Sequence, residues 1–588
     1  MRAARSLDPS VFAEARARGL SPTLARVVAG RIDATTDLDV VLEPKLSHIP
    51  SPNQLTDIDP ALERLASAIR DCEPIGILTD YDADGLTSHA VLYHALLRFG
   101  VSWDRLSHWI GHRLEEGYGI SPLLVDRMLD AKEPPSVVIS ADCGSSDEAQ
   151  IARLKAAGID VVVTDHHQVA ASGPPPSALA VINPNRLDCS YPDKAIAGCM
   201  VSWLVMSALR GRLLQTGQIP AETPKLGDLL DYVALGTVAD CVSLGASEIN
   251  RAVVRAGLAL IARRSRPCWD AALDKLTRAS RDVNAGLLAF QIAPRLNARG
   301  RIDHSMRGFE FLVADNPHEA SAAYADLDRD NFTRRQIEKQ MVEHAKPLAE
   351  RQALMGTQTL VVVLEDGHSG VQGIVASRLV EAIGRPAIVL TPGLADHSLT
   401  GSMRSVPGLN AKALLDHVAN HTHEVLIRYG GHVGACGMTL AKSELKVFHA
   451  ALETACAELY PDPPAVIRYQ TDGTLLAEDF QLDRVESLDL LAPYGRGFEE
   501  PLFEGVFEVL RATAIGADGS HLRLRLKTEQ SEVDAVWFGA QPAGQPPAAV
   551  AGDWLDCVFH LGINTYRGLE VSLTIRHGEV ITEGMVHV

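Results

Sequence analysis

The first half of the chain repeats one pattern, in which a short apolar run ends in a polar cluster and a helix-like segment follows. The runs are Ile75–Thr79, Val137–Ser140, Val161–Thr164 and Ala180–Ile182. Strands that alternate with helices are typical of βαβ units, because parallel strands need a long crossover connection. The pattern therefore predicts a mainly parallel sheet. In such sheets, binding sites form in the loops at the carboxyl ends of the strands.

The length of the chain indicates more than one domain. Its 588 residues exceed the ~100–200 residues that one domain usually holds. We expect an α/β multidomain architecture. Its predicted parts are an N-terminal helical segment at 1–70, the parallel-sheet domain at 71–316, a connecting helix at 317–356, a smaller α/β domain at 357–461 and a small β-barrel at 462–588.

The second half of the chain carries the patterns on which these divisions rest. From about Glu319 to Leu354 the sequence has helical character, with charges dense enough for a solvated face. A strand, helix and strand pattern follows, at Leu360–Leu364, Gly373–Ile383 and Ala387–Leu390. Farther on, apolar and polar residues alternate in HLRLRLK (His521–Lys527) and LEVSLTIR (Leu569–Arg576). Such alternation predicts half-buried antiparallel strands in a small barrel.

The charge balance restricts how the chain can bind a polyanion. It has 55 Lys and Arg against 74 Asp and Glu, a net charge of −19, which disfavours a general electrostatic nucleic-acid binder. A polyanion must therefore bind locally, through a basic channel or through metal ions.

The same sequence predicts a cytoplasmic protein with no membrane partner. No apolar run reaches the ~18 residues of a membrane helix, and the N-terminus lacks a secretory signal. Nine cysteines without a CxxC pair indicate neither disulfides nor a zinc site.

The strongest chemical signal is LTDYDADGLTS, at the end of the first predicted strand. Asp80, Asp82 and Asp84 alternate there, and Gly85 permits a turn into the next helix. Three carboxylates this close repel one another unless a cation lies among them. The segment therefore favours a metal site, although a polar, calcium-binding type of turn is the alternative from these residues alone.

Further candidate ligands follow the other apolar runs. Asp142 ends the second strand, Asp165, His166 and His167 end the third, and Asp240 follows an apolar helix-like run. Carboxylate and imidazole donors favour Mn²⁺ or Mg²⁺ over structural zinc. Two such ions, about 3.5–4 Å apart, can promote an in-line displacement at phosphorus.

Taken in order, DYDADG, the strand-end Asp142, DHH and GTVAD resemble the DHH phosphoesterase superfamily. The segments PRLNARGR, GVQGIVASRL, GSMRS and GGHVGACG resemble its RecJ family of single-stranded-DNA exonucleases, as do HRLEEGYGISP, INPN and PYGRGFEEPLF. The resemblance spans roughly residues 70 to 588. It implies a parallel-sheet DHH catalytic domain, a connecting helix, a smaller DHH-associated α/β domain and a C-terminal OB-like barrel that binds nucleic acid.

The resemblance also implies the roles of individual residues. The metal ligands would be Asp80, Asp82, Asp84, Asp142, His166 and Asp240. His167 would act as an acid or stabilise the leaving oxygen, and Asp165 would orient an imidazole. The expected DNA-binding residues are Arg113, Arg295, Asn297, Arg301, Arg378, Ser402, Arg404, Ser405, Gly430, Gly431 and His432.

Some of these positions also have a structural alternative. Arg295 or Arg301 could form an interdomain salt bridge, and Gly430–Gly431 could be a simple turn. In the barrel, the candidate DNA contacts are His521, Trp537, Phe538, Tyr566 and Arg567, although one of the adjacent Trp537 and Phe538 is expected in the core.

Three positions depart from the family pattern. Gly367, Met403 and Arg299 stand where the family usually has Trp, Gly and a small residue. We expect these changes to leave the metal ligands intact and to loosen the grip on DNA.

The implied activity is that of a single-stranded-DNA-specific 5′→3′ exonuclease in DNA repair and recombination. It would release 5′-mononucleotides with two Mn²⁺ or Mg²⁺ ions, act as a monomer, and work with a helicase and a single-strand-binding protein. The alternatives are a DHH-type oligoribonuclease or nucleotide phosphatase, and a non-catalytic RecJ-like DNA-binding scaffold.

Overall fold

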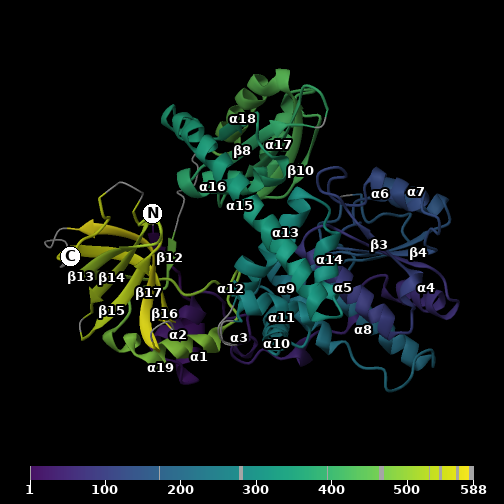
Figure 1. Cartoon of the computed structure of the whole chain (residues 1–588), viewed down its shortest axis with the longest axis horizontal. Coiled ribbons are helices and arrows are strands. Elements are labelled where there is room, and N and C mark those ends of the chain that lie inside the picture. Colours follow the sequence, from purple (N-terminus) through teal and green to yellow (C-terminus); the bar gives the residue numbers. More distant parts are fainter. Residues whose placement is uncertain are drawn as a thin grey trace.

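The computed structural model describes residues 2–170, 172–276, 283–393, 395–461, 469–528, 530–541, 546–564 and 568–581. Figure 1 shows the parallel-sheet domain on one side, a smaller α/β domain above it and a β-barrel on the other side. Long helix α15 (Pro317–Leu354) runs between the two α/β domains. The multidomain α/β architecture predicted from the sequence is confirmed.

The sheet of the larger domain is entirely parallel, in the order β3-β2-β4-β5-β6. Its strands are β2 (Ile75–Thr79), β3 (Leu106–Ile110), β4 (Val137–Ala141), β5 (Asp160–Thr164) and β6 (Ala180–Ile182). Four of them lie at the predicted apolar runs. The sequence pattern does not indicate the edge strand β3, because Ser107 and His108 interrupt its apolar character.

Two layers of helices bury the faces of this sheet. On one face, α5 (Ala83–Arg98), α8 (Gly198–Gln215) and α9 (Leu230–Ala239) share a core with Ile77, Ile139 and Val162. On the other face, α6 (Pro122–Leu129) and α7 (Glu148–Ala156) pack on the side chains that alternate with these. The remaining described α-helices of this domain are α4 (Ile58–Arg70), α10 (Asn250–Ala262), α11 (Pro267–Leu276), α12 (Ala285–Leu287), α13 (Ala293–Ile302) and α14 (Met306–Val313).

The connecting helix begins two residues before the start of its helical sequence pattern. The Asn316 side chain accepts a hydrogen bond from the backbone N–H of Glu319, and Pro317 occupies the first turn, where its missing N–H has no effect. One end of α15 packs on α11, α13 and α14, and the other on α16 (Gln372–Ile383) and β7 (Leu360–Val363) of the smaller domain. Helix α15 therefore has contacts with both α/β domains.

The smaller α/β domain has a mixed sheet in the order β10-β11-β9-β8-β7. Its strands are β7 (Leu360–Val363), β8 (Ala387–Pro392), β9 (Ser398–Arg404), β10 (Arg428–Gly431) and β11 (Ala435–Ala441), and its α-helices are α16 (Gln372–Ile383), α17 (Ala411–His421) and α18 (Leu445–Leu459). Only β7 and β8 pair in parallel among its described strands, and the other pairs are antiparallel.

The C-terminal strands form a closed barrel in the order β13-β14-β15-β17-β16. Its strands are β13 (Phe503–Ile515), β14 (His521–Lys527), β15 (Glu532–Trp537), β16 (Trp554–Asn564) and β17 (Glu570–Ile581). Leu522, Leu524 and Leu526 of β14 point inward and are buried, as the alternation predicts. The predicted OB-like barrel is therefore confirmed.

The N-terminal segment shares its core with the barrel. Helices α1 (Pro9–Ala17), α2 (Pro22–Ala29) and α3 (Leu38–Leu42) pack against the barrel and the short helix α19 (Leu482–Ser487). Strand β1 (Arg2–Ala4) also pairs in parallel with β12 (Tyr469–Thr471). Segments from the two ends of the sequence thus pack together, and the N-terminal helices share one hydrophobic core with the barrel.

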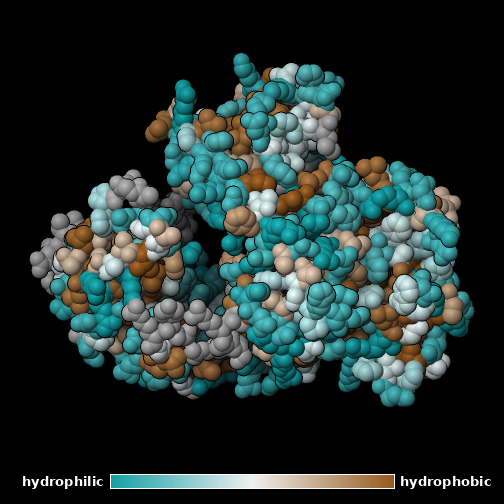
Figure 2. Space-filling view, in the orientation of Figure 1, coloured by the Kyte–Doolittle hydropathy of each residue, from teal (hydrophilic) through white to brown (hydrophobic). Residues whose placement is uncertain are grey.

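Figure 2 shows an open notch between the barrel and the two α/β domains. The surface around it is largely hydrophilic. No helix within the described ranges is both long and apolar enough to cross a bilayer.

A buried ion pair holds the N-terminal helices to the barrel side, and its removal is the first prediction. Arg31 donates two hydrogen bonds to the Asp472 carboxylate, at 2.6 and 2.9 Å, and both side chains are fully buried. Asp472→Asn would leave the Arg31 charge unpaired, which costs about 3–5 kcal/mol. We expect limited proteolysis between the parallel-sheet domain and the barrel to become at least about a hundredfold faster. The exposed Glu570→Gln serves as the control, and equal rates for both variants would contradict the prediction.

Candidate metal centre and nucleic-acid interface

The connection from β2 into the first turn of α5 carries the first three carboxylates, Asp80, Asp82 and Asp84. Asp82 caps α5, because its side-chain oxygen accepts hydrogen bonds from the backbone N–H groups of Asp84 at 2.9 Å and Gly85 at 3.1 Å. A Cβ at Gly85 would lie 2.2 Å from the Asp80 carbonyl oxygen, so only glycine fits this turn. The helix cap and the glycine together hold the three carboxylates close to one another at the start of α5.

Two neighbouring helices fix the Asp84 carboxylate. Its oxygens accept hydrogen bonds from the backbone N–H groups of Gly198 at 2.7 Å and Cys199 at 3.0 Å, in the first turn of α8. On the other side, a Cβ at Gly236 of α9 would lie 2.6 Å from an Asp84 oxygen. The positive end of α8 thus stabilises a carboxylate that is almost fully buried.

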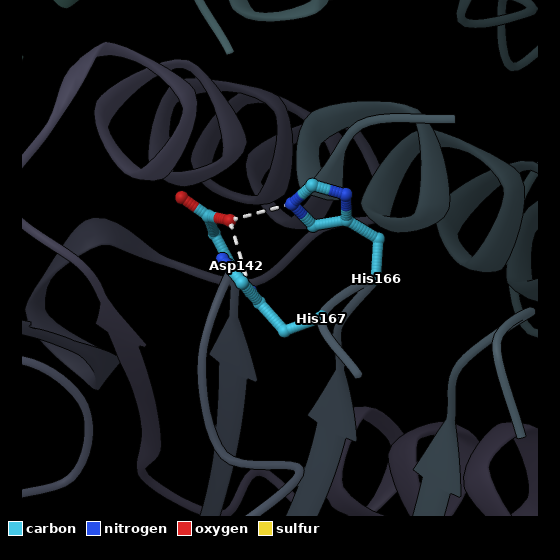
Figure 3. Close-up of side chains that lie close together, drawn as sticks. All are labelled: Asp142, His166 and His167. Atoms are coloured by element: carbon cyan, nitrogen blue, oxygen red, sulfur yellow. Dashed lines mark hydrogen bonds and ion pairs between the residues drawn. The ribbon is translucent and has the colours of Figure 1, made fainter. Parts of the chain in front are cut away.

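Asp142 follows β4 and points toward the same place. Its backbone is left-handed, with φ of 59°, a conformation that Asp tolerates better than most residues. The His166 Nε2 atom lies 3.2 Å from an Asp142 oxygen, and the His167 Nδ1 atom lies 3.8 Å from the same oxygen. Figure 3 shows both imidazole rings directed at this carboxylate from the adjacent loop.

The Asp165 side chain holds the loop that carries His166 and His167. Its carboxylate accepts hydrogen bonds from the backbone of Ser145 at 3.0 Å and from His167 Nδ1 at 2.8 Å. The INPN segment holds the loop as well, since Asn183 donates to the His167 carbonyl at 2.8 Å. The geometry matches the orienting role predicted for Asp165, and that role stays a prediction.

The candidate ligands gather into three overlapping groups, in each of which the donor atoms lie within 4.8 Å of one another. The groups are Asp80, Asp82 and Asp142; Asp84, His166 and Asp240; and Asp142, His166 and His167. All six predicted metal ligands are among them. Asp142 and His166 each belong to two groups, so they lie where two adjacent ions could share ligands.

Electrostatics favour a cation at this position. Burial raises the pKa of Asp80 and of Asp142 well above the ordinary value, and neighbouring carboxylates raise both further. Burial, followed by the charges of Asp84 and Asp82, raises the pKa of Asp240 to about 8. Divalent ions stabilise the charged form of buried carboxylates whose pKa is raised in this way. A donor set made mostly of carboxylate oxygens fits Mn²⁺ or Mg²⁺.

His167 lies at the edge of the cluster. Burial lowers the pKa of its ring, but the hydrogen bond and charge of Asp165 outweigh burial and raise the pKa to about 9. The Tyr118 hydroxyl lies 2.9 Å from His167 Nδ1. The sequence analysis singled out the segment HRLEEGYGISP, which contains Tyr118, but missed Tyr118 as a site residue, because its contact with His167 joins segments far apart in the sequence. From the smaller domain, the His432 ring stacks over His167 at a centroid distance of 6.5 Å.

Arg113, Arg301 and Arg404 form a positive cluster beside the carboxylates. Arg113 lies 4.3 Å above the Tyr81 ring, and its buried Nε has no hydrogen-bond partner among the described residues. Burial and the charges of Arg113, Arg334 and Arg404 lower the pKa of Arg301 to about 9. A cluster of guanidinium groups of this kind suits an anion such as a phosphate.

Other predicted DNA contacts differ in their surroundings. Asn297 accepts a hydrogen bond from the Ala83 backbone N–H at 2.7 Å, so it adjoins the metal loop. Arg295 instead pairs with Asp328 of α15 at 2.8 Å, which supports the structural alternative for this residue. The other positions lie in the smaller domain, where Arg378 pairs with Glu338 and Glu381. Strands of its sheet carry Ser402, Arg404, Gly430 and Gly431. The Ser405 hydroxyl donates a hydrogen bond to the Leu409 carbonyl.

The three departures from the family pattern are accommodated by packing. Met403 is fully buried in the core of the smaller domain, and Arg299 pairs with Asp303 at 2.7 Å and Asp330 at 3.0 Å. A Cβ at Gly367 would lie 2.6 Å from the Thr391 methyl group, so this domain has no room for Trp at that position. Because the Met403 side chain points into the core, any effect of this residue on DNA binding must act through the packing of the sheet.

In the barrel, the adjacent aromatic residues divide as predicted. Trp537 packs partly against the barrel core, and Phe538 is 62% exposed. The His521 ring contacts Phe538 edge to face at 5.4 Å. Tyr566 and Arg567 lie outside the described residues.

A segment next to the barrel holds the loop that follows Asp240. The Leu244 N–H donates to the Arg496 carbonyl at 2.8 Å, and a Cβ at Gly245 would lie 2.2 Å from the Gly497 carbonyl oxygen. Arg251, which is fully buried, anchors the same segment by donating to the Pro493 carbonyl at 2.9 Å. The sequence alone predicts only a nucleic-acid-binding role for the C-terminal part. The structure adds a second role, the support of the Asp240 loop.

Comparisons with known proteins agree with this architecture. Family models match at residues 74–237 (DHH family, N-terminal domain), 356–458 (DHHA1 domain) and 471–577 (RecJ OB domain). The single-stranded-DNA-specific exonuclease RecJ of Haemophilus influenzae is 33% identical over 93% of this chain and 94% of its own length. The corresponding protein of Salmonella typhimurium is 34% identical, with the same coverage.

Solved structures are similar as well. The crystal structure of RecJ in complex with Mn²⁺ from Thermus thermophilus has a TM-score of 0.79 at 28% identity, and the match covers 99% of this chain and 80% of that one. A structure of the same protein with Mg²⁺ has a TM-score of 0.74 at 26% identity, over 99% and 79% of the two chains.

The contact between Gly245 and Gly497 generates the second prediction. Gly245→Ala would force the two loops apart and shift Asp240, because the new methyl group cannot fit against the backbone. We expect Mn²⁺ affinity, measured by calorimetry, to fall by about 10–100-fold, as for other supports of metal ligands. Gly211→Ala in α8 is the matched control, since its Cβ would meet no atom within 4 Å. Unchanged affinity in Gly245→Ala would show that the segment does not hold the site.

Proposed function

The chain belongs to the RecJ family of single-stranded-DNA-specific exonucleases, and we propose that it hydrolyses single-stranded DNA from the 5′ end to 5′-mononucleotides. The observation that carries this proposal is the set of donors Asp80, Asp82, Asp84, Asp142, His166 and Asp240 at one edge of the parallel sheet. Arginines cluster beside these donors, so an anionic strand can approach an otherwise acidic protein.

The metal cofactors are divalent cations, Mn²⁺ or Mg²⁺, and the overlapping donor groups accommodate two of them. When bound, such ions lower the pKa of a water molecule and stabilise the negative charge that develops on phosphate oxygens. The protein contributes the fixed geometry. Asp82 is held by the α5 backbone and Asp84 by the α8 backbone, so neither carboxylate has to reorganise.

The remaining site residues bind and orient the strand. Arg113 and Arg404 are suited to the terminal phosphate, because guanidinium groups bind phosphate bidentately. The Arg404 side chain passes over Gly373, where a Cβ would lie 2.5 Å from its Nη2. His167 donates its Nδ1 proton to Asp165, which fixes the ring, and its raised pKa keeps it protonated to stabilise a leaving oxygen.

The alternatives explain less of the chain. An oligoribonuclease or nucleotide phosphatase has no use for the OB-like barrel, whose aromatic side chains suit a single strand. A non-catalytic scaffold has no need of buried carboxylates that destabilise the metal-free protein. We further propose that the enzyme acts as a monomer in the cytoplasm, in DNA repair and recombination, on strands that a helicase opens and a single-strand-binding protein coats.

Removal of a metal ligand is the third prediction. Asp142→Ala or Asp82→Ala removes a carboxylate without removing core volume, so we expect Mn²⁺-dependent nucleotide release to disappear while the circular dichroism spectrum persists. His167→Ala is the comparison, because it should retain bound Mn²⁺ and lose most turnover. Activity in Asp142→Ala, or an equal loss of Mn²⁺ in His167→Ala, would contradict the assigned roles.

Strand polarity is the fourth prediction. Single strands labelled at either end should release mononucleotides from the 5′ end, and a blunt duplex should resist degradation. Arg404→Ala should raise the KM for 5′-phosphorylated strands at least about tenfold, since a charge-assisted contact contributes about 1.5–3 kcal/mol. Mn²⁺ affinity should be unchanged. Release that begins at the 3′ end would overturn the direction and leave the metal chemistry intact.

A further inference from the structure

The C-terminal ends of two packed helices in the smaller domain carry metal-binding side chains that the proposed reaction does not use. His417 and His421 belong to α17, and Glu458 belongs to α18. The two helices share the core of this domain and lie side by side in Figure 1. In the sequence, the segment DHVANHTHE places two histidines four residues apart. Side chains at this spacing lie next to each other on one face of a helix.

The two imidazole rings lie against each other. Their centroids are 4.0 Å apart, and their planes differ by 20°. The His417 Nε2 atom also lies 2.9 Å from a Glu458 carboxylate oxygen, which joins α17 to α18. The His417 side chain is only 15% exposed, whereas His421 and Glu458 lie at the surface. One donor is therefore held in place, and the other two can turn toward an ion beside it.

A hydrogen bond to the helix backbone fixes the tautomer of His421. Its Nδ1 atom lies 2.9 Å from the His417 carbonyl oxygen. Because a carbonyl oxygen can only accept, Nδ1 carries the proton, and the lone pair of the neutral ring is on Nε2. Histidines that bind metal ions in proteins have this arrangement, in which one ring nitrogen donates to a carbonyl and the other contacts the ion. This hydrogen bond indicates a metal ligand independently of the spacing of the histidines.

The donor class of this group differs from that of the catalytic centre. Two imidazole nitrogens and one carboxylate oxygen are donors that suit Zn²⁺, Ni²⁺ and Cu²⁺, whereas the carboxylate-rich cluster fits Mn²⁺ or Mg²⁺. A zinc ion with three protein ligands completes its tetrahedral coordination with a water molecule. The two groups of side chains therefore select different kinds of ion.

We propose that His417, His421 and Glu458 form a second metal site, which binds Zn²⁺ or a similar transition-metal ion and ties the end of α17 to the end of α18. The ion takes the place of the proton between His417 Nε2 and the Glu458 carboxylate. That proton moves to Nδ1 of the same ring, and the ion gains bonds to both Nε2 atoms and to the carboxylate. The inference goes beyond the exonuclease function, which needs none of these three side chains.

The first test counts bound ions by equilibrium dialysis of the full chain, without an affinity tag, against micromolar Zn²⁺ in the presence of Mn²⁺. We expect His421→Gln to bind one Zn²⁺ per chain fewer than the wild-type protein. All other histidines, cysteines and carboxylates are the same in both proteins, so the difference isolates this site. Mn²⁺-dependent nucleotide release should be unchanged in the variant.

A matched control and a second variant keep this test specific. His344→Gln should bind as many ions as the wild type, because His344 is an exposed residue of α15 and the sequence places no second histidine three or four residues from it. Glu458→Gln changes a side chain that is 60% exposed. It should weaken Zn²⁺ binding at least about tenfold, since even the loss of a group that only supports a ligand costs about 10–100-fold.

Cu²⁺ is the probe that identifies the donors. The difference between the electron paramagnetic resonance spectra of the wild type and of His421→Gln should show one Cu²⁺ coupled to two imidazole nitrogens. Zn²⁺ should also raise the Tm of the wild type and of His344→Gln, but not that of His421→Gln. Equal numbers of bound Zn²⁺ in the wild type and His421→Gln, or a difference spectrum without this coupling, would overturn the inference, whether or not the protein is an exonuclease.

Discussion

The repulsion among buried carboxylates at one edge of the parallel sheet is the constraint on which the rest of the structure depends. Burial and mutual charge raise the pKa values of Asp80, Asp142 and Asp240, so the site is stable in its charged form only with cations among the oxygens. The surrounding elements fit this demand. The α8 backbone stabilises Asp84, and the Pro493–Glu499 segment holds the loop after Asp240 from outside the parallel-sheet domain.

Positive charge is concentrated beside the carboxylates, where the proposed function requires an anion to bind. Arg113, Arg301 and Arg404 gather there. The chain as a whole is acidic, which disfavours nonspecific binding elsewhere. The smaller domain takes part directly, since His432 lies over His167. The site is therefore assembled from several domains, and their packing matters to its chemistry.

The local features could be predicted from the sequence, because strand ends and candidate metal ligands form short patterns of neighbouring residues. Four strands, the connecting helix and the grouping of the six ligands needed only periodicity and a family resemblance. What it missed depends on contacts between distant segments. Tyr118 reaches His167 from a loop after an irregular edge strand, β1 pairs with β12 across the whole chain, and Gly245 meets Gly497 backbone to backbone. No local pattern indicates such contacts. Likewise, the sequence does not indicate that Arg295 pairs with Asp328 on another helix, and its role at DNA stays a prediction.

The most direct test of the metal centre is to count the ions in the carboxylate cluster. Crystals grown with Mn²⁺, with diffraction data collected at the manganese absorption edge, would locate each ion by its anomalous signal. We expect two peaks about 3.5–4 Å apart, with Asp142 contacting both. A single peak, or peaks that Asp142 does not contact, would contradict the assignment of a two-metal site.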